Sequence, residues 1–176
     1  MSDPLPYGLD RAESVRPPRL GYGIWLRRVF IAVLTVYVLL GLVNVFGQVT
    51  TTTEASSSGA DLRVTAPAAL RGGLIYQVSI QISARQSFKT ARLILSPGWF
   101  SGLTTNAMVP QPSQQYSIAG ETVFTLGSLQ PGDRRTVHIY FQVNPTTVAW
   151  ERPQTVVLDD GTRRIAEVDR TVNIYP

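Results

Sequence analysis

Residues 74–85 read LIYQVSIQISAR, and apolar and polar side chains alternate along this stretch one by one. Because neighbouring residues of a β-strand point to opposite faces, a period of two predicts a long strand with one buried face. Four later stretches repeat the pattern: residues 91–95, 124–126, 137–143 and 166–174. In the last of them Arg170 falls on the apolar face, which indicates a sheet edge or a change of register there.

Turn signals separate these predicted strands. Pro131 and Gly132 suit the two central positions of a β-turn, Asp160-Gly161 is a strong hairpin signal, and Pro97-Gly98 ends the second of the alternating runs. With further short strands at residues 62–67 and 154–158, residues 62–176 are expected to hold about seven strands. Strands of this number and spacing predict a mainly β domain in which two sheets form a sandwich.

The segment from residue 124 to 143, FTLGSLQPGDRRTVHIYFQV, carries a resemblance. Leu129, Pro131 and Gly132 match an L-x-PG turn that introduces the penultimate core strand in immunoglobulin-like domains of bacterial membrane-anchored surface proteins. The chain is similar to these domains over residues 62–176, although the Cys pair and core Trp of antibody domains are absent. The resemblance implies an immunoglobulin-like β-sandwich on a membrane anchor, and it transfers no activity.

Residues 29–47, VFIAVLTVYVLLGLVNVFG, contain no charged residue. A helix that rises about 1.5 Å per residue would cross about 28 Å here, enough for one transmembrane helix. A cleaved signal peptide is the alternative, but its apolar region is usually shorter, so we favour a signal anchor. Arg27 and Arg28 precede the segment and no basic residue follows before Arg63. The positive-inside rule therefore predicts a cytoplasmic N-terminus and an extracytoplasmic C-terminal domain in the cell membrane.

The regions on either side of the helix are poor in large apolar residues. Residues 1–28 are rich in Pro and polar residues, and we expect a disordered cytoplasmic tail. Residues 48–61, QVTTTTEASSSGAD, have the composition of a flexible Thr/Ser-rich linker. The predicted order is thus tail, helix, linker and β-sandwich.

No motif for catalysis is present. The chain has no Cys and a single His, His138, which excludes thiol chemistry and does not suffice for a typical zinc site. No Gly-X-Ser-X-Gly elbow or phosphate loop occurs, and the acidic residues near 159–169 lack the spacing of a calcium loop. The net charge is +4, but basic residues adjoin only in pairs, which argues against nucleic acid. We therefore expect a protein that is not an enzyme and has no cofactor or metal.

Two roles remain open at this point. In the first, the protein is an accessory or scaffold subunit of a membrane protein complex, and its helix packs on other integral membrane proteins. Gly41 and Asn44, three residues apart on the predicted helix, are its candidate contacts, because small and polar residues favour helix packing. In the second, the sandwich is an independent membrane-anchored binding module for an envelope partner, a glycan or a peptide.

The loop at residues 96–103, SPGWFSGL, is the candidate contact surface of the outer domain. Trp99, Phe100 and Leu103 are large apolar residues in a stretch that Pro and Gly mark as a loop. They predict an apolar anchor for a partner or for the membrane surface. The alternative is that one of the aromatic rings closes an open end of the sandwich core.

Overall fold

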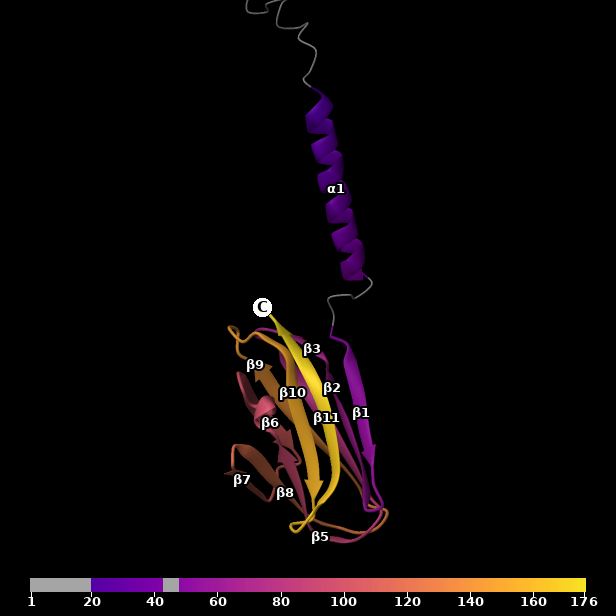
Figure 1. Cartoon of the computed structure of the whole chain (residues 1–176), viewed down its shortest axis with the longest axis vertical. Helices are drawn as coiled ribbons and strands as arrows, with labels where there is room; N and C mark the ends of the chain where they lie inside the picture. The colour runs from indigo at the N-terminus through magenta and orange to yellow at the C-terminus, as the bar shows by residue number, and fades with distance from the viewer. Residues whose placement is uncertain (1–19, 43–47) are drawn as a thin grey trace, which may run out of the picture. The chain divides into compact units, whose positions relative to one another are not determined.

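A computed structural model of the chain describes residues 20–42 and 48–176. The chain divides into two compact units, residues 1–47 and Gln48–Pro176, which Figure 1 draws as one helix and one β domain. The predictions for residues 1–19 and 43–47, including the contact role of Asn44, lie outside the described residues.

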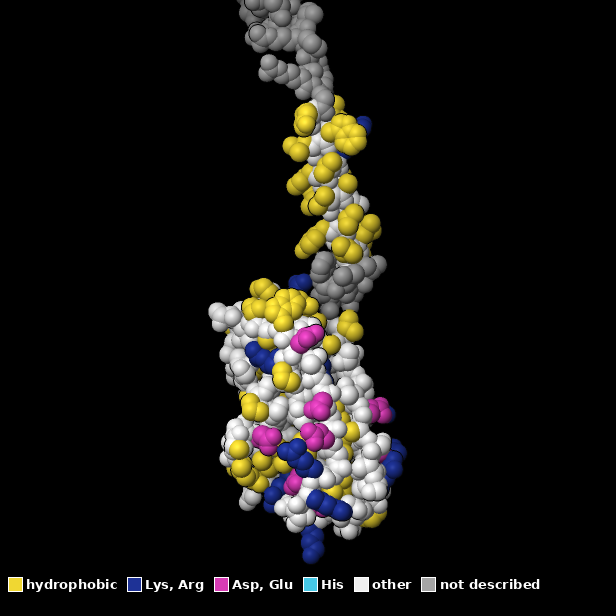
Figure 2. Space-filling view, viewed as in Figure 1, with side chains coloured by type: hydrophobic (Ala, Val, Ile, Leu, Met, Phe, Trp, Pro, Cys, Tyr) yellow, Lys and Arg dark blue, Asp and Glu magenta, His cyan; other side chains and the backbone are white. Residues whose placement is uncertain are grey.

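The first unit contains the helix α1 (Leu20–Leu42). It is long and apolar enough to cross a membrane, and no described side chain of the span is buried in the protein; Figure 2 shows apolar side chains along its visible side. The prediction of a disordered tail is wrong for residues 20–28, which belong to α1. The last proline of the tail is Pro18, so no proline interrupts the helix after it begins. Arg27 and Arg28 consequently lie within α1.

The second unit is built of strands. Their bounds are β1 (Thr50–Ser56), β2 (Ala60–Pro67), β3 (Ala69–Arg71), β4 (Ile75–Ala84), β5 (Phe88–Leu95), β6 (Leu103–Val109), β7 (Gln114–Ile118), β8 (Glu121–Leu129), β9 (Arg134–Val143), β10 (Ala149–Asp159) and β11 (Arg164–Tyr175). A short 3-10 helix, η1 (Pro97–Trp99), follows β5.

The strands form two sheets, one in the order β1-β2-β4-β9-β6 and the other in the order β3-β11-β10-β5-β8-β7 (Figure 1). The turn at Pro131-Gly132 is present, with the Asp133 amide donating to the Gln130 carbonyl over 3.0 Å. Because β8 and β9 belong to different sheets, this turn carries the chain across the sandwich. The predicted hairpin joins β10 to β11, which pair antiparallel. The domain is an immunoglobulin-like β-sandwich preceded by an apolar helix, as the sequence predicts.

The alternating stretches supply the core. In β4 the burial of side chains changes at every residue, and Tyr76, Val78, Ile80, Ile82 and Ala84 are all buried. Their counterparts across the sandwich come from β5, β8, β10 and β11. Burying a branched aliphatic side chain contributes about 1.5–3 kcal/mol. The buried side chains of the two facing sheets therefore stabilise this domain, which has no disulfides.

The structure has four strands that the sequence does not predict: β1, β3, β6 and β7. The flexible-linker interpretation is wrong for residues 50–56, which pair with β2 along their whole length. Thr is a good strand former because of its branched Cβ, and Thr51, Thr53 and Ala55 are half-buried on one side of this edge strand. The folded domain therefore begins near residue 48 and not at residue 62.

Arg170 lies inside the sandwich, where its side chain joins the two sheets. Its guanidinium donates to the carbonyl oxygens of Pro67 at 2.6 Å and Ala66 at 3.2 Å, and it also reaches the Thr51 hydroxyl at 3.4 Å. Burial lowers its pKa, with Tyr76 acting in the opposite direction. The predicted sheet edge is present beside Arg170, because β3 pairs with β11 only at residues 173–175.

Candidate functional site

Trp99 is part of the core. Its side chain is completely buried, its ring stacks on Phe141 at a centroid distance of 6.1 Å, and the Arg170 guanidinium lies 5.6 Å from the ring centre. The indole N–H donates to the carbonyl oxygen of Thr155 over 3.1 Å. The sandwich thus has a core Trp after all, on the connection after β5, and the contact role predicted for this residue is wrong.

The other two large apolar side chains of the loop at residues 96–103 also pack inward. Phe100 is half-buried and meets Phe141 edge-on at 5.9 Å, and Leu103 is only 7% exposed. Gly98 lies so close to β10 that a Cβ there would stand 1.9 Å from the Pro153 carbonyl oxygen. This close approach requires glycine and presses the loop onto the sandwich. The loop therefore fits the alternative prediction, in which one of its aromatic rings closes an open end of the sandwich core.

The predicted residues of the helix are described only in part. Gly41 is exposed, and beyond its two chain neighbours no described side chain of α1 lies within 4 Å of a Cβ added there. The Thr35 hydroxyl donates to the Ile31 carbonyl over 2.8 Å, so this polar group is satisfied within α1.

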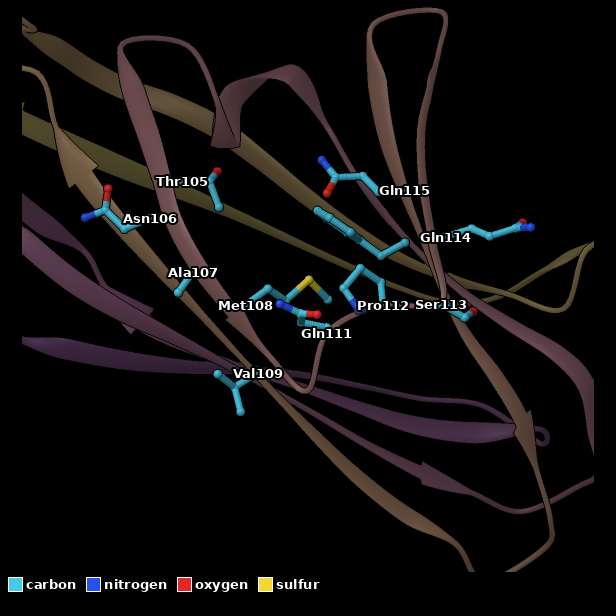
Figure 3. A pocket seen from close by; sticks show the side chains of 11 residues that line it. Thr105, Asn106, Ala107, Met108, Val109, Gln111, Pro112, Ser113, Gln114 and Gln115 are labelled. Carbon is cyan, nitrogen blue, oxygen red and sulfur yellow. The ribbon is translucent and has the colours of Figure 1, made fainter.

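A groove between β6 and β7 is the candidate binding site. It encloses about 640 Å³, and Figure 3 shows Met108, Gln111 and Pro112 gathered between the two strands. We call it the β6–β7 groove, and its lining residues are Thr105, Asn106, Ala107, Met108, Val109, Gln111, Pro112, Ser113, Gln114, Gln115 and Phe124. Their side chains offer amides and hydroxyls above an apolar floor, and none carries a charge.

Each wall of the groove is an edge strand. Within its sheet β6 pairs only with β9, and β7 pairs only with β8. Four successive residues of β6, at positions 104–107, are exposed, so neither face of this part of the strand is packed on the core. A register shift between Thr105 and Ala107 marks a bulge at Asn106. Both walls therefore present backbone groups that no strand of this domain covers.

The groove lies in the longest uncharged stretch of the outer domain. No Asp, Glu, Lys or Arg occurs between Arg92 and Glu121. Edge strands of soluble proteins usually carry charges that prevent pairing with other chains. This signal, together with the run of Asn and Gln at 106–115, was available in the sequence, and it points to a contact surface more directly than the aromatic loop does.

A second cavity, of about 380 Å³, has a different character. It lies over β1, β2, β4 and the start of β9, and four of its five charged lining residues form ion pairs. Arg63 meets Glu54 at 2.8 Å, and Arg85 meets Asp61 at 2.7 Å. The charges that line this cavity are therefore mostly those of ordinary ion pairs on the surface of the sheet. Exposed pairs of this kind contribute little to stability.

The shifted pKa values lie away from the β6–β7 groove. Burial raises the pKa of Tyr76, whose hydroxyl has no hydrogen-bond partner in the core. Hydrogen bonds from the Thr162 hydroxyl and amide hold the pKa of Asp160 at about 2, in the hairpin between β10 and β11. Packing and turn geometry explain both shifts. Among residues 20–42 and 48–176, no three His, Cys, Asp or Glu side chains are grouped to hold a metal ion.

Comparison with known proteins gives a likeness in fold. No protein-family model and no curated protein matches the chain. The chain is similar to CaCohA2 from Clostridium acetobutylicum, with 14% identity and a TM-score of 0.44 over 67% of this chain and 93% of that one. It is also similar to a CARDB domain from Pyrococcus furiosus, with 11% identity and a TM-score of 0.41 over 68% and 97% of the two chains. A third likeness is to a non-cellulosomal cohesin from Archaeoglobus fulgidus, with 16% identity and a TM-score of 0.35 over 62% and 83%. Identities this low carry no functional information.

Proposed function

We propose that the protein is a non-catalytic, single-pass membrane protein whose extracytoplasmic sandwich binds an extended segment of another protein in the β6–β7 groove. The observation that carries this proposal is the pair of uncharged, uncovered edge strands that form the walls of the groove.

The anchor rests on α1 and its charges. An apolar helix of this length needs a membrane or a partner to cover it, and the described part of the chain does not cover it. Arg27 and Arg28 lie toward its N-terminal end, so the positive-inside rule favours a cytoplasmic N-terminus. Protease added to intact spheroplasts should then digest the sandwich domain but leave an epitope tag at Met1 protected. Digestion of the tag with survival of the domain would invert the orientation.

The groove suits a polypeptide strand. An extended segment laid beside β6 can form main-chain hydrogen bonds with the free edge, while the amides of Gln111 and Gln115 contact its side chains. A glycan is a poorer fit, because sugar rings stack on exposed aromatic faces. The one aromatic residue of the lining is Phe124, which is 2% exposed.

Both roles that the sequence leaves open can use this groove. A subunit of a stable complex should remain bound to its membrane partners after mild detergent extraction. An independent module should be recovered alone and should bind its partner reversibly. Size-exclusion chromatography of the extracted protein separates the accessory role from the independent one.

The binding role is tested with random 12-residue peptides displayed on phage and selected against the full chain in nanodiscs. Selected peptides should lose at least about tenfold in affinity, about 1.4 kcal/mol, when Thr105→Lys or Gln115→Lys places a charge in the groove. Thr171→Lys is the matched control, since Thr171 is exposed on β11, which β10, β5 and β8 separate from the groove strand β7. Peptides that bind all four proteins equally, or a selection without binders, would contradict the proposal.

A further inference from the structure

Apolar side chains gather at one end of the sandwich. Residues 48–176 expose seven large hydrophobic side chains. Five of them lie at or beside the start of β1, β4 or β10 or the end of β11, and these strand ends share one end of the sandwich (Figure 1). We call these five residues the Trp150 patch; they are Val49, Ile75, Val148, Trp150 and Tyr175. Figure 2 shows apolar side chains clustered at this end of the domain.

Hydrogen bonds connect the segments that carry the patch. The Ala68 amide donates to the Val49 carbonyl over 3.1 Å, and the Asn173 amide donates to the Ala68 carbonyl over 2.9 Å. Across the same end, the Gly72 amide donates to the Tyr175 carbonyl over 3.0 Å. These bonds hold the segments that carry Val49 and Tyr175 together at this end of the domain.

Trp150 is turned outward by the backbone. The register of β10 and β11 shifts between Ala149 and Arg152, which marks a bulge. Within it Glu151 has a φ of 46°, a left-handed conformation that residues with a Cβ rarely adopt. The Asn173 side chain holds this bulge by accepting the Glu151 amide over 2.7 Å. As a result Trp150 is 67% exposed and meets Tyr175 edge-on at 5.1 Å.

The chain restricts what can cover this surface. Seven residues, 43–49, separate the end of α1 from the start of β1, and seven residues span at most about 25 Å. The patch includes the last of these residues, Val49. If α1 crosses the membrane, the patch belongs to the end of the domain that the chain tethers to the bilayer. Trp and Tyr are the residues enriched at membrane–water interfaces, where their rings reach the headgroup level.

We propose that the Trp150 patch rests on the lipid headgroup region of the membrane in which α1 is anchored, and so holds the sandwich against the bilayer surface. The inference rests on the anchoring role of α1 proposed above. The occupant is the bilayer interface, because it is the surface nearest to the tether and the one that an exposed Trp–Tyr pair suits best.

The test uses the fluorescence of the full chain in nanodiscs. The Trp25→Phe variant leaves Trp99, which is fully buried, and Trp150 as the emitting residues. Lipid brominated close to the headgroup should remove roughly half or more of the Trp150 emission, since interfacial side chains lie about 5–10 Å into the headgroup boundary. The matched control adds Trp150→Phe to Trp25→Phe and leaves only Trp99, which the brominated lipid should not quench.

Each outcome decides the inference. Loss of emission in brominated lipid, absent from the control, supports contact with the bilayer. Emission that brominated lipid leaves unchanged and aqueous iodide quenches would place Trp150 in water and overturn the proposal. Emission insensitive to both quenchers would mean that protein covers the patch, which also overturns it. A chain that fails to enter nanodiscs at all would instead refute the anchoring role of α1.

Discussion

Replacing Trp99 by Ala should lower the free energy of unfolding of the sandwich by about 3.5–7 kcal/mol. Truncating a fully buried aromatic residue costs about 3–5 kcal/mol through lost burial and the cavity left behind. Loss of the Arg170 contact with the ring adds about 0.5–2 kcal/mol. The lost hydrogen bond to Thr155 adds little, because that carbonyl oxygen also accepts from the Ser96 amide at 3.1 Å. Such a loss is a large part of the stability of a small domain.

The assay is urea unfolding of the fragment from residue 48 to 176, followed by circular dichroism. Trp99→Phe keeps a ring in the core and loses the indole N–H, so it should cost about 1–2 kcal/mol. Trp150→Phe changes an exposed ring and should stay within about 0.5 kcal/mol of the parent. If Trp99→Ala lowers the free energy of unfolding no more than Trp150→Phe does, Trp99 does not stabilise the core. The loop at residues 96–103 would then again be a candidate contact surface.

Three further outcomes follow from the fold. A fragment that begins at Leu62 should be at least about 2 kcal/mol less stable to urea than one that begins at Gln48, because it lacks β1 and the hydrogen bonds of that strand; equal stability would restore the linker interpretation. Arg170→Met should lower stability by about 2–4 kcal/mol, because two buried carbonyl oxygens lose a charged donor; a more stable variant would show that burying the charge costs more than its contacts contribute. The pKa of Asp160 is about 2 in the folded chain against an ordinary 3.8, so its stabilising effect is present above about pH 4 and is lost as the pH falls toward 2. Melting curves of Asp160→Asn between pH 7 and 2 should lack this part of the acid decline, and an unchanged pH profile would show that the hairpin contacts of the carboxylate do not matter.

The sequence predicts those strands whose burial alternates most clearly. The period of two predicts β4, β9 and β11, which bury every second residue over residues 76–84, 137–143 and 166–174. β1 was missed because Thr and Ser have the composition of a linker, although Thr also favours strands at an edge. β6 and β7 were missed because side chains on both of their faces are exposed, so no alternation marks them.

The candidate site was less predictable than the fold. Aromatic residues in a Gly- and Pro-containing loop suggest an exposed anchor, but the sequence does not show that Gly98 allows the loop to press against Pro153. The β6–β7 groove depends on two strands that end different sheets and meet only through the tertiary structure. Its sequence signal is an uncharged stretch that contains several amides. This signal indicates a binding surface only once both strands are known to be edge strands.

The binding of an extended segment beside β6 is tested most directly by amide hydrogen exchange of the full chain with a peptide selected for the groove. The opposite edge of the same sheet, β1, is the internal control. We predict that the peptide slows exchange in Leu103–Val109 and leaves Thr50–Ser56 unchanged, because an added strand accepts hydrogen bonds from the free edge of β6. Peptide binding that protects β1, or that leaves the β6 amides exchanging as fast as before, would contradict a binding groove at this edge.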